Sequence, residues 1–457
     1  MTLLKILNAL KKVSAIVRTL KSVRHVKAPK YAQRAACTGL AVVAFVLSSA
    51  THSGEFDIRP ALADDPAVAA GTVVSNKNID KFRDWLAPAL ADLIAQGRVE
   101  IPIGEFLQLP MHPSYIAATE GNSTTVRLGE RNGDIVDYVA GRPFPGEPDS
   151  TDPRAGEKAA WNMRYGYGPD ESETELMTWR YKDFAKGVEE RRIEMYGALM
   201  RFSHRHTREP IPELNDNPGE LYSALYLKVD FPYDIRNTQL LTHSKKDDAE
   251  PEQAWIYLNT QRRVKRLGTG QKTDAFLGSD IMIEDFLGYN GRVRDMNWQY
   301  LDTVEVLTPI YGFDQLSTDR KVELEGYEVI GFTGAAECFP NITWQPRTVH
   351  RVKATPVAPE HPIGHRLFYM DAVTYAPLMT QIYDRADKLW KLGIVALSDS
   401  SAHGPENVEW LGQITDGVTM IDLQAERCTT LQFKTRIPEE GLRSRLFTTQ
   451  QMRSAGR

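Results

Sequence analysis

The stretch EQAWIYLNTQRRVKRLGTGQKTDAFLGSDIMIEDF, residues 252–286, carries the clearest pattern in the chain. It begins with an alternation in which Trp255 and Tyr257 fall on one side of an extended chain and aliphatic residues on the other, which predicts a β-strand. The basic run QRRVKR at 261–266 follows, and Gly268 opens a break. The stretch therefore predicts a strand that ends in a charged turn.

Similar alternating segments occur on both sides of this stretch, and turn residues separate them. Upstream they lie at 177–181, 192–196, 221–231 and 238–242, and downstream at 298–308, 323–331, 344–354, 366–370, 375–383, 388–397 and 417–435. Consecutive short strands joined by tight turns favour an antiparallel meander, which can curl into a barrel or half-barrel. We therefore expect a mainly β protein with few helices.

The clearest helical pattern covers residues 78–97. Apolar residues recur there at helical spacing from Ile79 to Leu93, Asn78 can cap the start and Gly97 suits the end. Pro88 falls inside the pattern and should break it into two short helices. Such a helix could cover a cavity, but ordinary core packing explains the pattern equally well.

The first 63 residues have the composition of an export signal. Residues 1–36 are basic and contain no acidic residue, and residues 37–50 form a short apolar run. Ala61-Leu-Ala63 is an A-x-A cleavage site, with Ser48-Ser-Ala50 as an alternative, and an uncleaved N-terminal anchor is a third interpretation. We expect a signal peptide at 1–63, one large domain at 64–457, and a location in the periplasm of a Gram-negative cell.

The charge balance argues against a nucleic-acid-binding protein. Removal of residues 1–63, which contain ten Lys or Arg and two acidic residues, leaves a net charge of −13. Nucleic-acid-binding domains usually carry a basic face. The run at 261–266 is therefore a local feature, and a solvated turn is its simplest interpretation.

Motifs that announce catalysis are absent from the sequence, which contains no H-E-x-x-H, G-x-S-x-G, glycine-rich phosphate loop or C-x-x-C. The pairs His204/His206 and His361/His365 lack companion ligands at a spacing typical of zinc sites, so we expect neither a metal nor another cofactor. Cys338 and Cys428 remain after signal removal. In an oxidising compartment they could form a disulfide, and two buried thiols are the alternative.

Several motifs resemble one known family. They are W-x-Y-L…Q-R-R-V-K-R-L and F-L-G-S-D…E-D in the opening stretch, D-Y-V-A-G-R-P-F-P at 137–145, D-P-x-A-G at 152–156, A-W-N at 160–162, P-x-D-I-R at 232–236, Y-x-D-A-x-T at 369–374, Y-D-x-x-x-x-L-W at 383–390 and R-S-A-G-R at 453–457. Together they resemble the domain of unknown function 1329 family, which is placed with the lipoprotein carriers LolA and LolB. The likeness covers most of residues 79–457. Two departures are a missing P-A-W-T-G-G segment near the start and Asn237 where the family has Gly.

The resemblance implies a fold and a type of site. The expected fold is α+β and mainly β: a LolA-like curved antiparallel sheet or half-barrel closed over helices, with an apolar cavity. The cavity candidates are apolar residues on alternating strands, namely Trp255, Tyr257, Leu367, Tyr369 and Met379. The filled-core alternative is that these side chains leave no space. The resemblance also implies partners in the envelope, and Arg262, Arg263, Lys265 and Arg266 are the candidate docking residues.

Three functions remain open at this point. The first is a periplasmic carrier for a hydrophobic ligand such as a lipid, a lipoprotein acyl chain or a sterol-like compound. This carrier would work with an inner-membrane efflux-type transporter and an outer-membrane protein, and it would be associated with the outer membrane. The second is an envelope scaffold that carries nothing. The third, an enzyme acting on a hydrophobic substrate, would need a buried catalytic cluster that the sequence does not announce, so we do not expect an enzyme.

Overall fold

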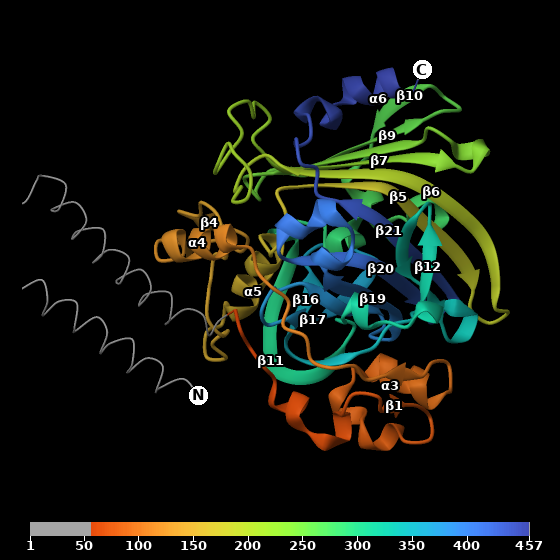
Figure 1. Ribbon diagram of the computed structural model, residues 1–457. Helices are drawn as coiled ribbons and strands as arrows, with labels where there is room; N and C mark the ends of the chain where they lie inside the picture. Colours follow the sequence, from red (N-terminus) through yellow and green to blue (C-terminus); the bar gives the residue numbers. More distant parts are fainter. Residues whose placement is uncertain (1–55, 457) are drawn as a thin grey trace, which may run out of the picture. The chain divides into compact units, whose positions relative to one another are not determined.

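Thirteen antiparallel strands form one curved, open sheet in the computed structural model, which describes residues 56–456 (Figure 1). From one edge to the other the strands are β10 (Arg263–Arg266), β9 (Gln253–Leu258), β8 (Gln239–Lys245), β7 (Leu221–Phe231), β6 (Val188–Arg201), β5 (Glu171–Asp183), β21 (Arg427–Arg436), β20 (Gln413–Asp422), β19 (Leu389–Asp399), β18 (Pro377–Asp384), β17 (Ile363–Asp371), β16 (Gln345–Pro356) and β11 (Met296–Thr308). Because β10 and β11 do not pair with each other, the sheet has two free edges. The predicted antiparallel meander and curved sheet are confirmed.

The order of the strands determines where the chain must cross the sheet. From β5 to β10 each strand pairs with the one before it, so the chain moves outward from the centre to one edge. The next long strand, β11, lies at the opposite edge, and β16 to β21 return inward until β21 pairs with β5. Residues 267–295, here called the crossing segment, therefore connect the two edges.

The remaining elements are short. The α-helices are α3 (Pro88–Ala95), α4 (Pro113–Asn122), α5 (Ala155–Arg164) and α6 (Thr449–Ala455). Small two-stranded sheets pair β1 (Val73–Val74) with β2 (Ile101–Pro102), β3 (Arg127–Leu128) with β4 (Ile135–Val136), β12 (Lys321–Leu324) with β13 (Tyr327–Ile330), and β14 (Phe332–Thr333) with β15 (Phe339–Pro340). Among the described helices, none has both the length and the apolar character needed to cross a bilayer.

The predicted helix at 78–97 is only half helical. Its first half forms two 3-10 turns, η3 (Ile79–Lys81) and η4 (Arg83–Trp85), and α3 begins at Pro88. Proline is well suited to the first position of a helix, where its missing N–H is not needed. Asn78 does not cap η3; its side chain accepts a hydrogen bond from the Ser75 N–H at 2.8 Å. The break at Pro88 is thus as predicted, but the first half is not α-helical.

Both faces of the sheet are covered. On one face, here called the opposite face, α3 and its neighbours pack against β18 and β19, and the N–H of Ala89 donates to Gln381 at 2.9 Å. On the same face α6 packs on β7 to β9, and the Tyr257 hydroxyl donates to the Gly456 carbonyl at 2.8 Å. In Figure 1 these helices lie at the bottom and the top of the sheet. Helix α3 with its neighbours, and helix α6 near the C-terminus, therefore cover the same face of the sheet.

The other face, here called the cavity face, carries α5 and the crossing segment. Helix α5 lies on β11, where a Cβ on Gly156 would sit 2.6 Å from the backbone of Trp298. Only glycine allows so close an approach between a helix and a strand. The helix thereby covers the β11 side of this face and leaves the middle of the sheet to the crossing segment.

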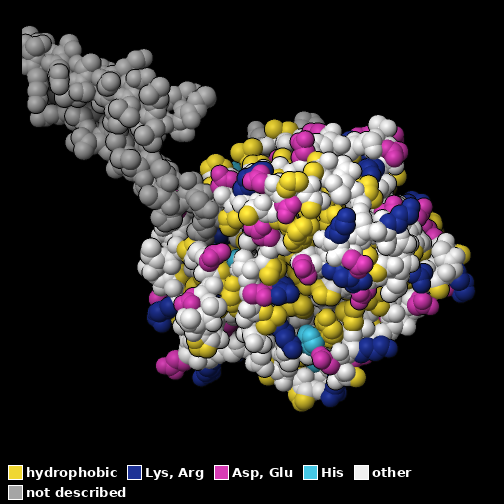
Figure 2. Space-filling model, turned by 90° about the horizontal axis from the view of Figure 1, so that it is seen from below, with side chains coloured by type: hydrophobic (Ala, Val, Ile, Leu, Met, Phe, Trp, Pro, Cys, Tyr) yellow, Lys and Arg dark blue, Asp and Glu magenta, His cyan; other side chains and the backbone are white. Residues whose placement is uncertain are grey.

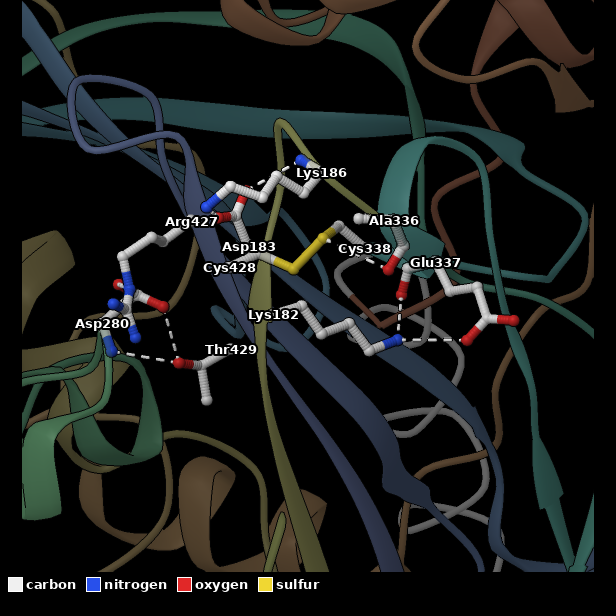
Figure 3. Close-up of a disulfide and its surroundings, with 10 residues drawn as sticks. All are labelled: Lys182, Asp183, Lys186, Asp280, Ala336, Glu337, Cys338, Arg427, Cys428 and Thr429. Carbon is white, nitrogen blue, oxygen red and sulfur yellow. Dashed lines mark hydrogen bonds and ion pairs between the residues drawn. A yellow bond between two sulfur atoms is a disulfide. The ribbon is translucent and has the colours of Figure 1, made fainter. Parts of the chain in front are cut away.

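The disulfide was one of two alternatives for the cysteines, and the structure joins Cys338 to Cys428 (Figure 3). Cys428 lies on β21, and Cys338 follows the 3-10 turn η12 (Ala335–Glu337) within the long insertion between β11 and β16. Next to the bridge Lys182 of β5 donates to the Glu337 carbonyl at 2.8 Å. Both sulfur-bearing residues are fully buried. The bridge therefore fastens the insertion to the centre of the sheet.

The described chain begins before the predicted cleavage site after Ala63. Phe56 and Leu62 are buried, and the N–H groups of Ala61 and Leu62 donate to the carboxylate of Glu305 at 2.8 and 2.6 Å. Residues 56–63 thus pack on the domain. The basic residues of the segment 1–36, the apolar run at 37–50 and the Ala50 site lie outside the described residues.

Candidate ligand-binding cavity

The crossing segment contains the tripeptide Phe-Leu-Gly twice, at 276–278 and 286–288. In both copies the leucine has a left-handed backbone, with φ of 52° at Leu277 and 56° at Leu287. The rings of Phe276 and Phe286 meet edge to face at 5.4 Å, and both contact the ring of Trp179, at 5.7 and 6.1 Å. The repeat thus forms two similar turns that press their phenylalanines against one tryptophan of β5.

A buried ion-pair cluster fixes the second turn to β17. The guanidinium of Arg366, 1% exposed, donates to Glu284 at 2.8 Å and to Asp285 at 2.5 Å, and His361 lies 3.3 Å from Glu284. Burial alone would raise the pKa of Glu284, but His361 and Arg366 outweigh it and lower this pKa to about 2. The carboxylate is therefore charged at neutral pH and holds the segment electrostatically.

Further contacts fix the first turn to β19 and β21. The ammonium of Lys391 donates to the Asp280 carbonyl at 2.6 Å, and the Thr429 hydroxyl donates to the Asp280 carboxylate at 2.7 Å. Burial lowers the pKa of Lys391 and raises that of Asp280. Because three separate strands hold it, the crossing segment is a fixed wall of the cavity face.

A cavity of about 430 Å³ lies between this wall and the sheet. Residues of the crossing segment and of β5 to β7 and β17 to β21 line it. Small-molecule sites commonly measure roughly 300–1,000 Å³ and have mainly apolar walls with a few polar groups. In size and lining this cavity is therefore typical of a ligand site.

The strand register arranges the lining as rows across the sheet. At one end Arg201, Ser223 and Ser244 are direct neighbours on β6, β7 and β8. The next rows, in order, are Ser172, Leu199 and Leu225; Thr435, Thr174, Gly197 and Leu227; Phe433 and Met177; and Val418, Leu431 and Trp179. The lining thus changes from polar to apolar along the strands.

The cavity is also long. From Arg201 to Ile193, the β6 residue that pairs with Trp179, the strand advances eight residues, or about 27 Å at 3.3–3.4 Å per residue. A cavity of this length and volume is a narrow slot, and we use that word for it below. Gly197 and Gly393 lie in strand interiors on its wall, where glycine often marks the close approach of a ligand.

The five residues predicted to line the cavity lie elsewhere. Trp255 and Tyr257 are on the opposite face of β9, in the cluster under α6. Leu367, Tyr369 and Met379 are on the opposite face of β17 and β18, in or against the cluster under α3. The strand alternation correctly grouped these residues on one face. It placed the cavity on the wrong side because covering segments make both faces apolar, so the pattern alone does not show which face is hollow.

The basic run lies at a free edge of the sheet. Arg262, Arg263, Lys265 and Arg266 are all exposed, and Arg262 has a left-handed backbone with φ of 48°. Within residues 56–456 none of the four forms an ion pair. None of the four lines the slot, and their role in partner docking stays a prediction.

The histidine pairs singled out in the sequence have structural partners. His204 Nδ1 lies 2.7 Å from the Val139 carbonyl, and His206 Nε2 lies 3.1 Å from Arg201. Burial lowers the pKa of each to about 4. His361 belongs to the ion-pair cluster, and His365 lies 3.2 Å from Asp387. In the described part of the chain no three His, Cys, Asp or Glu residues are grouped as a metal site would require.

A buried Ser-His-Asp group near the slot does not have the geometry of a catalytic triad. Nε2 of His403 lies 2.7 Å from the Ser398 hydroxyl and 2.8 Å from the Asp416 carboxylate. A triad needs the serine and the acid on different ring nitrogens. Tyr311 also donates to Asp416, and all four side chains are buried. The arrangement is that of a core polar network.

Several slot residues were missed in the sequence. Met177 and Trp179 belong to a strand that was predicted, Gly393 lies within the predicted strand 388–397, and Gly197 directly follows the predicted strand 192–196. The signals that could have found them are these glycines within strands and the repeated Phe-Leu-Gly. Arg201 had no signal, since its importance depends on the cross-strand neighbours that only the register supplies.

The family model described as "Protein of unknown function (DUF1329)" matches residues 73–453. The chain is also 24% identical over 400 residues to the uncharacterized protein PA3922 of Pseudomonas aeruginosa, a match that covers 84% of this chain and 80% of that protein. The predicted family is thus confirmed.

Three solved structures are similar at low identity. A putative outer membrane lipoprotein-sorting protein domain from Vibrio parahaemolyticus is 17% identical, with a TM-score of 0.45 over 66% of this chain and 100% of that one. A DUF1329 family protein from Desulfovibrio piger is 15% identical, with a TM-score of 0.44 and the same two coverages. The LolA superfamily protein NE2245 from Nitrosomonas europaea is 11% identical, with a TM-score of 0.36 over 65% of this chain and 98% of that one.

Proposed function

The chain belongs to the DUF1329 family, and from the slot in its sheet we propose that it is a binding and carrier protein for a hydrophobic ligand. The observation that carries the proposal is the slot itself: a narrow cavity of about 430 Å³ whose inner rows are Met, Trp, Leu, Phe and Val. A protein that needs only a stable core fills such a space, because interiors pack densely and voids cost stability.

The binding energy would come from burial of apolar area. Each buried CH₂ contributes about 0.8 kcal/mol, so a twelve-carbon chain supplies roughly 9–10 kcal/mol before the costs of association. Lipids and lipoprotein acyl chains are the ligands that fit this form. A sterol-like compound fits less well because a rigid ring system is wider than a linear chain.

The place of action that we propose is the periplasm, with association to the outer membrane. The basic and apolar composition of residues 1–50 supports export. Packing of Phe56 and Leu62 on the domain favours cleavage after Ala50 over cleavage after Ala63, which would remove those contacts. An inner-membrane efflux-type transporter and an outer-membrane protein are the proposed partners.

A scaffold that carries nothing is the second candidate, and the exposed edge of the sheet favours it. Strand β10 pairs only with β9, and its cations are exposed. A free strand edge can pair with a strand of another protein. Charged residues on an edge also serve simply to prevent aggregation, however, so this observation is weaker than the slot.

Native purification followed by mass spectrometry of extracted lipid tests the carrier proposal. We expect apolar material to copurify with the wild type and to be lost from Gly393→Leu, which places a side chain in the slot. A Cβ at Gly393 meets Met420 at 3.4 Å, an ordinary contact, so this variant should fold. Gly121→Leu is the matched control because a Cβ there has open space and lies outside the slot. A wild type that neither retains lipid nor binds an added fatty acid would rule out the carrier.

A further inference from the structure

The polar end of the slot contains a cation that has no direct ion pair among the described residues. Arg201, which lines this end, donates to the Gly166 carbonyl at 2.8 Å and lies 3.1 Å from His206 Nε2. Across residues 56–456 no carboxylate forms an ion pair with Arg201. The positive charge of this side chain therefore lies at the slot with hydrogen-bond partners but without a directly paired carboxylate.

The neighbouring titratable groups make no direct ion pair with Arg201. Burial, together with nearby Arg201, lowers the pKa of His206 to about 4, so this histidine is neutral at pH 7. The carboxylate of Asp170 attracts Arg201 at longer range, since each group shifts the pKa of the other toward its charged form, but no direct ion pair joins them. Its oxygens accept hydrogen bonds from the backbone N–H groups of His206, Thr207 and Arg208. Asp170 thus serves the loop that follows β6.

A second guanidinium lies at the same end. Arg164 lines the slot, donates to the Gly291 carbonyl at 3.0 Å and lies 3.9 Å from Asp248. Its guanidinium is 5.5 Å from the ring centre of Tyr222, which precedes Ser223 on β7. The third slot arginine, Arg366, is already paired with two carboxylates. Among the three slot arginines, Arg201 is therefore the one without a direct ion pair.

The rest of the lining fixes the orientation of a guest. Ser223 and Ser244 stand beside Arg201 in the same cross-strand row. The Ser223 hydroxyl can donate a hydrogen bond to a guest, whereas that of Ser244 donates to Glu252 at 3.2 Å. Beyond them the rows become increasingly apolar, and the row of Trp179 lies about 27 Å from Arg201 along the strand. A site with a charged end and a long apolar end matches a linear molecule of the same form.

We propose that the slot selects an anionic single-chain amphiphile, with its carboxylate or phosphate head at Arg201 and its alkyl chain along the apolar rows toward Trp179. The inference rests on the carrier function proposed above and adds the headgroup. Guanidinium groups bind carboxylate and phosphate through paired hydrogen bonds, so the geometry accommodates both heads.

The test compares twelve-carbon probes that differ only in the head: dodecanoate, dodecyl phosphate and neutral 1-dodecanol, each displacing a fluorescent fatty acid from the wild type. A hydrogen bond to a charged group contributes about 1.5–3 kcal/mol, which corresponds to roughly tenfold or more in affinity. We expect the two anions to bind at least about tenfold more tightly than the alcohol. The relative affinity of the anions shows which head is preferred.

Variants then locate the headgroup. Arg201→Gln should weaken both anions about tenfold and leave 1-dodecanol unchanged, whereas Arg201→Lys, which keeps the charge, should retain most of the preference. Arg192→Gln is the matched control, since Arg192 is on the same strand but on the opposite face and pairs with Glu194. Equal binding of all three probes by the wild type would overturn the headgroup inference and leave the carrier intact. Binding of none would remove the carrier itself.

Discussion

Removal of the Cys338–Cys428 bridge should destabilise the protein severely without emptying the slot. The bridge closes a separation of 90 residues, and the chain-entropy relation for a loop of that length gives about 4–5 kcal/mol at 25 °C. Domains of this kind are stable by roughly 5–15 kcal/mol, so the loss is a large fraction of the total. Because Cys428 points to the opposite face, where it pairs with Ile421, the slot lining is not altered directly.

The assay is guanidinium unfolding, followed by far-UV circular dichroism, of the wild type with and without reductant and of the double variant Cys338→Ala/Cys428→Ala. We expect the reduced wild type and the double variant to lose similar free energies of unfolding, about 4–5 kcal/mol each. Ile421→Val is the packing control and should cost only about 0.5–1.5 kcal/mol. A double variant as stable as the oxidised wild type would refute the reasoning. So would loss of dodecanoate binding in a folded double variant, because it would show that the bridge shapes the slot.

Three further perturbations test the buried groups. The pKa values of His204 and His206 are lowered to about 4, so the unfolded chain binds more protons than the folded one between pH 6.5 and 4. The free energy of unfolding should therefore fall by about 2–3 kcal/mol per histidine between pH 7 and 4.5. His206→Gln should reduce the dependence of this free energy on pH, as measured by urea titration at each pH. Glu284, with its pKa lowered to about 2, stabilises the fold fully above about pH 4.5 and loses this contribution as pH falls toward 2. Glu284→Gln at pH 7 should lower the free energy of unfolding by about 3–5 kcal/mol because it leaves buried Arg366 partly unpaired. A loss below about 0.5 kcal/mol in urea unfolding would contradict the role of this ion pair in holding the crossing segment on β17. Trp179→Ala should cost about 3–5 kcal/mol and expose the crossing segment to limited proteolysis, and unchanged cleavage there would show that the Phe-Leu-Gly turns are held without it.

Local pattern predicted the strands well because period-two alternation is a property of neighbouring residues. The runs at 366–370, 375–383 and 388–397 became β17, β18 and β19 with small shifts at their ends. The helix at 78–97 was only half right, because the apolar spacing of Ile79 to Leu86 is satisfied equally well by two 3-10 turns packed in the core. Spacing reports which residues are buried and says less about the backbone that buries them.

The position of the cavity could not be predicted from the same pattern. In a sheet with one wet face, alternation identifies the inward side. Here Trp255 and Tyr257 are apolar because α6 covers them, and Met177 and Trp179 are apolar because they line the slot or contact the crossing segment. Choosing between the two sides requires knowledge of which distant segment covers which face, and that depends on strand order.

Strand order also explains why a hollow exists at all. A chain that builds the sheet outward from β5 to β10 and then inward from β11 to β21 must cross from one edge to the other. A crossing of 29 residues with two tight turns cannot fill a face that is thirteen strands wide. The crossing segment instead attaches at discrete points: Arg366 for one turn and Lys391 for the other. Between those anchors and the Arg201 end, the crossing segment does not pack against the cavity face of the sheet. Gly197 and Gly393 have no side chains to fill the space that is left. The existence of the slot therefore follows from the order of the strands. The individual residues determine only the chemistry of its lining, which is polar at one end and apolar along the rest.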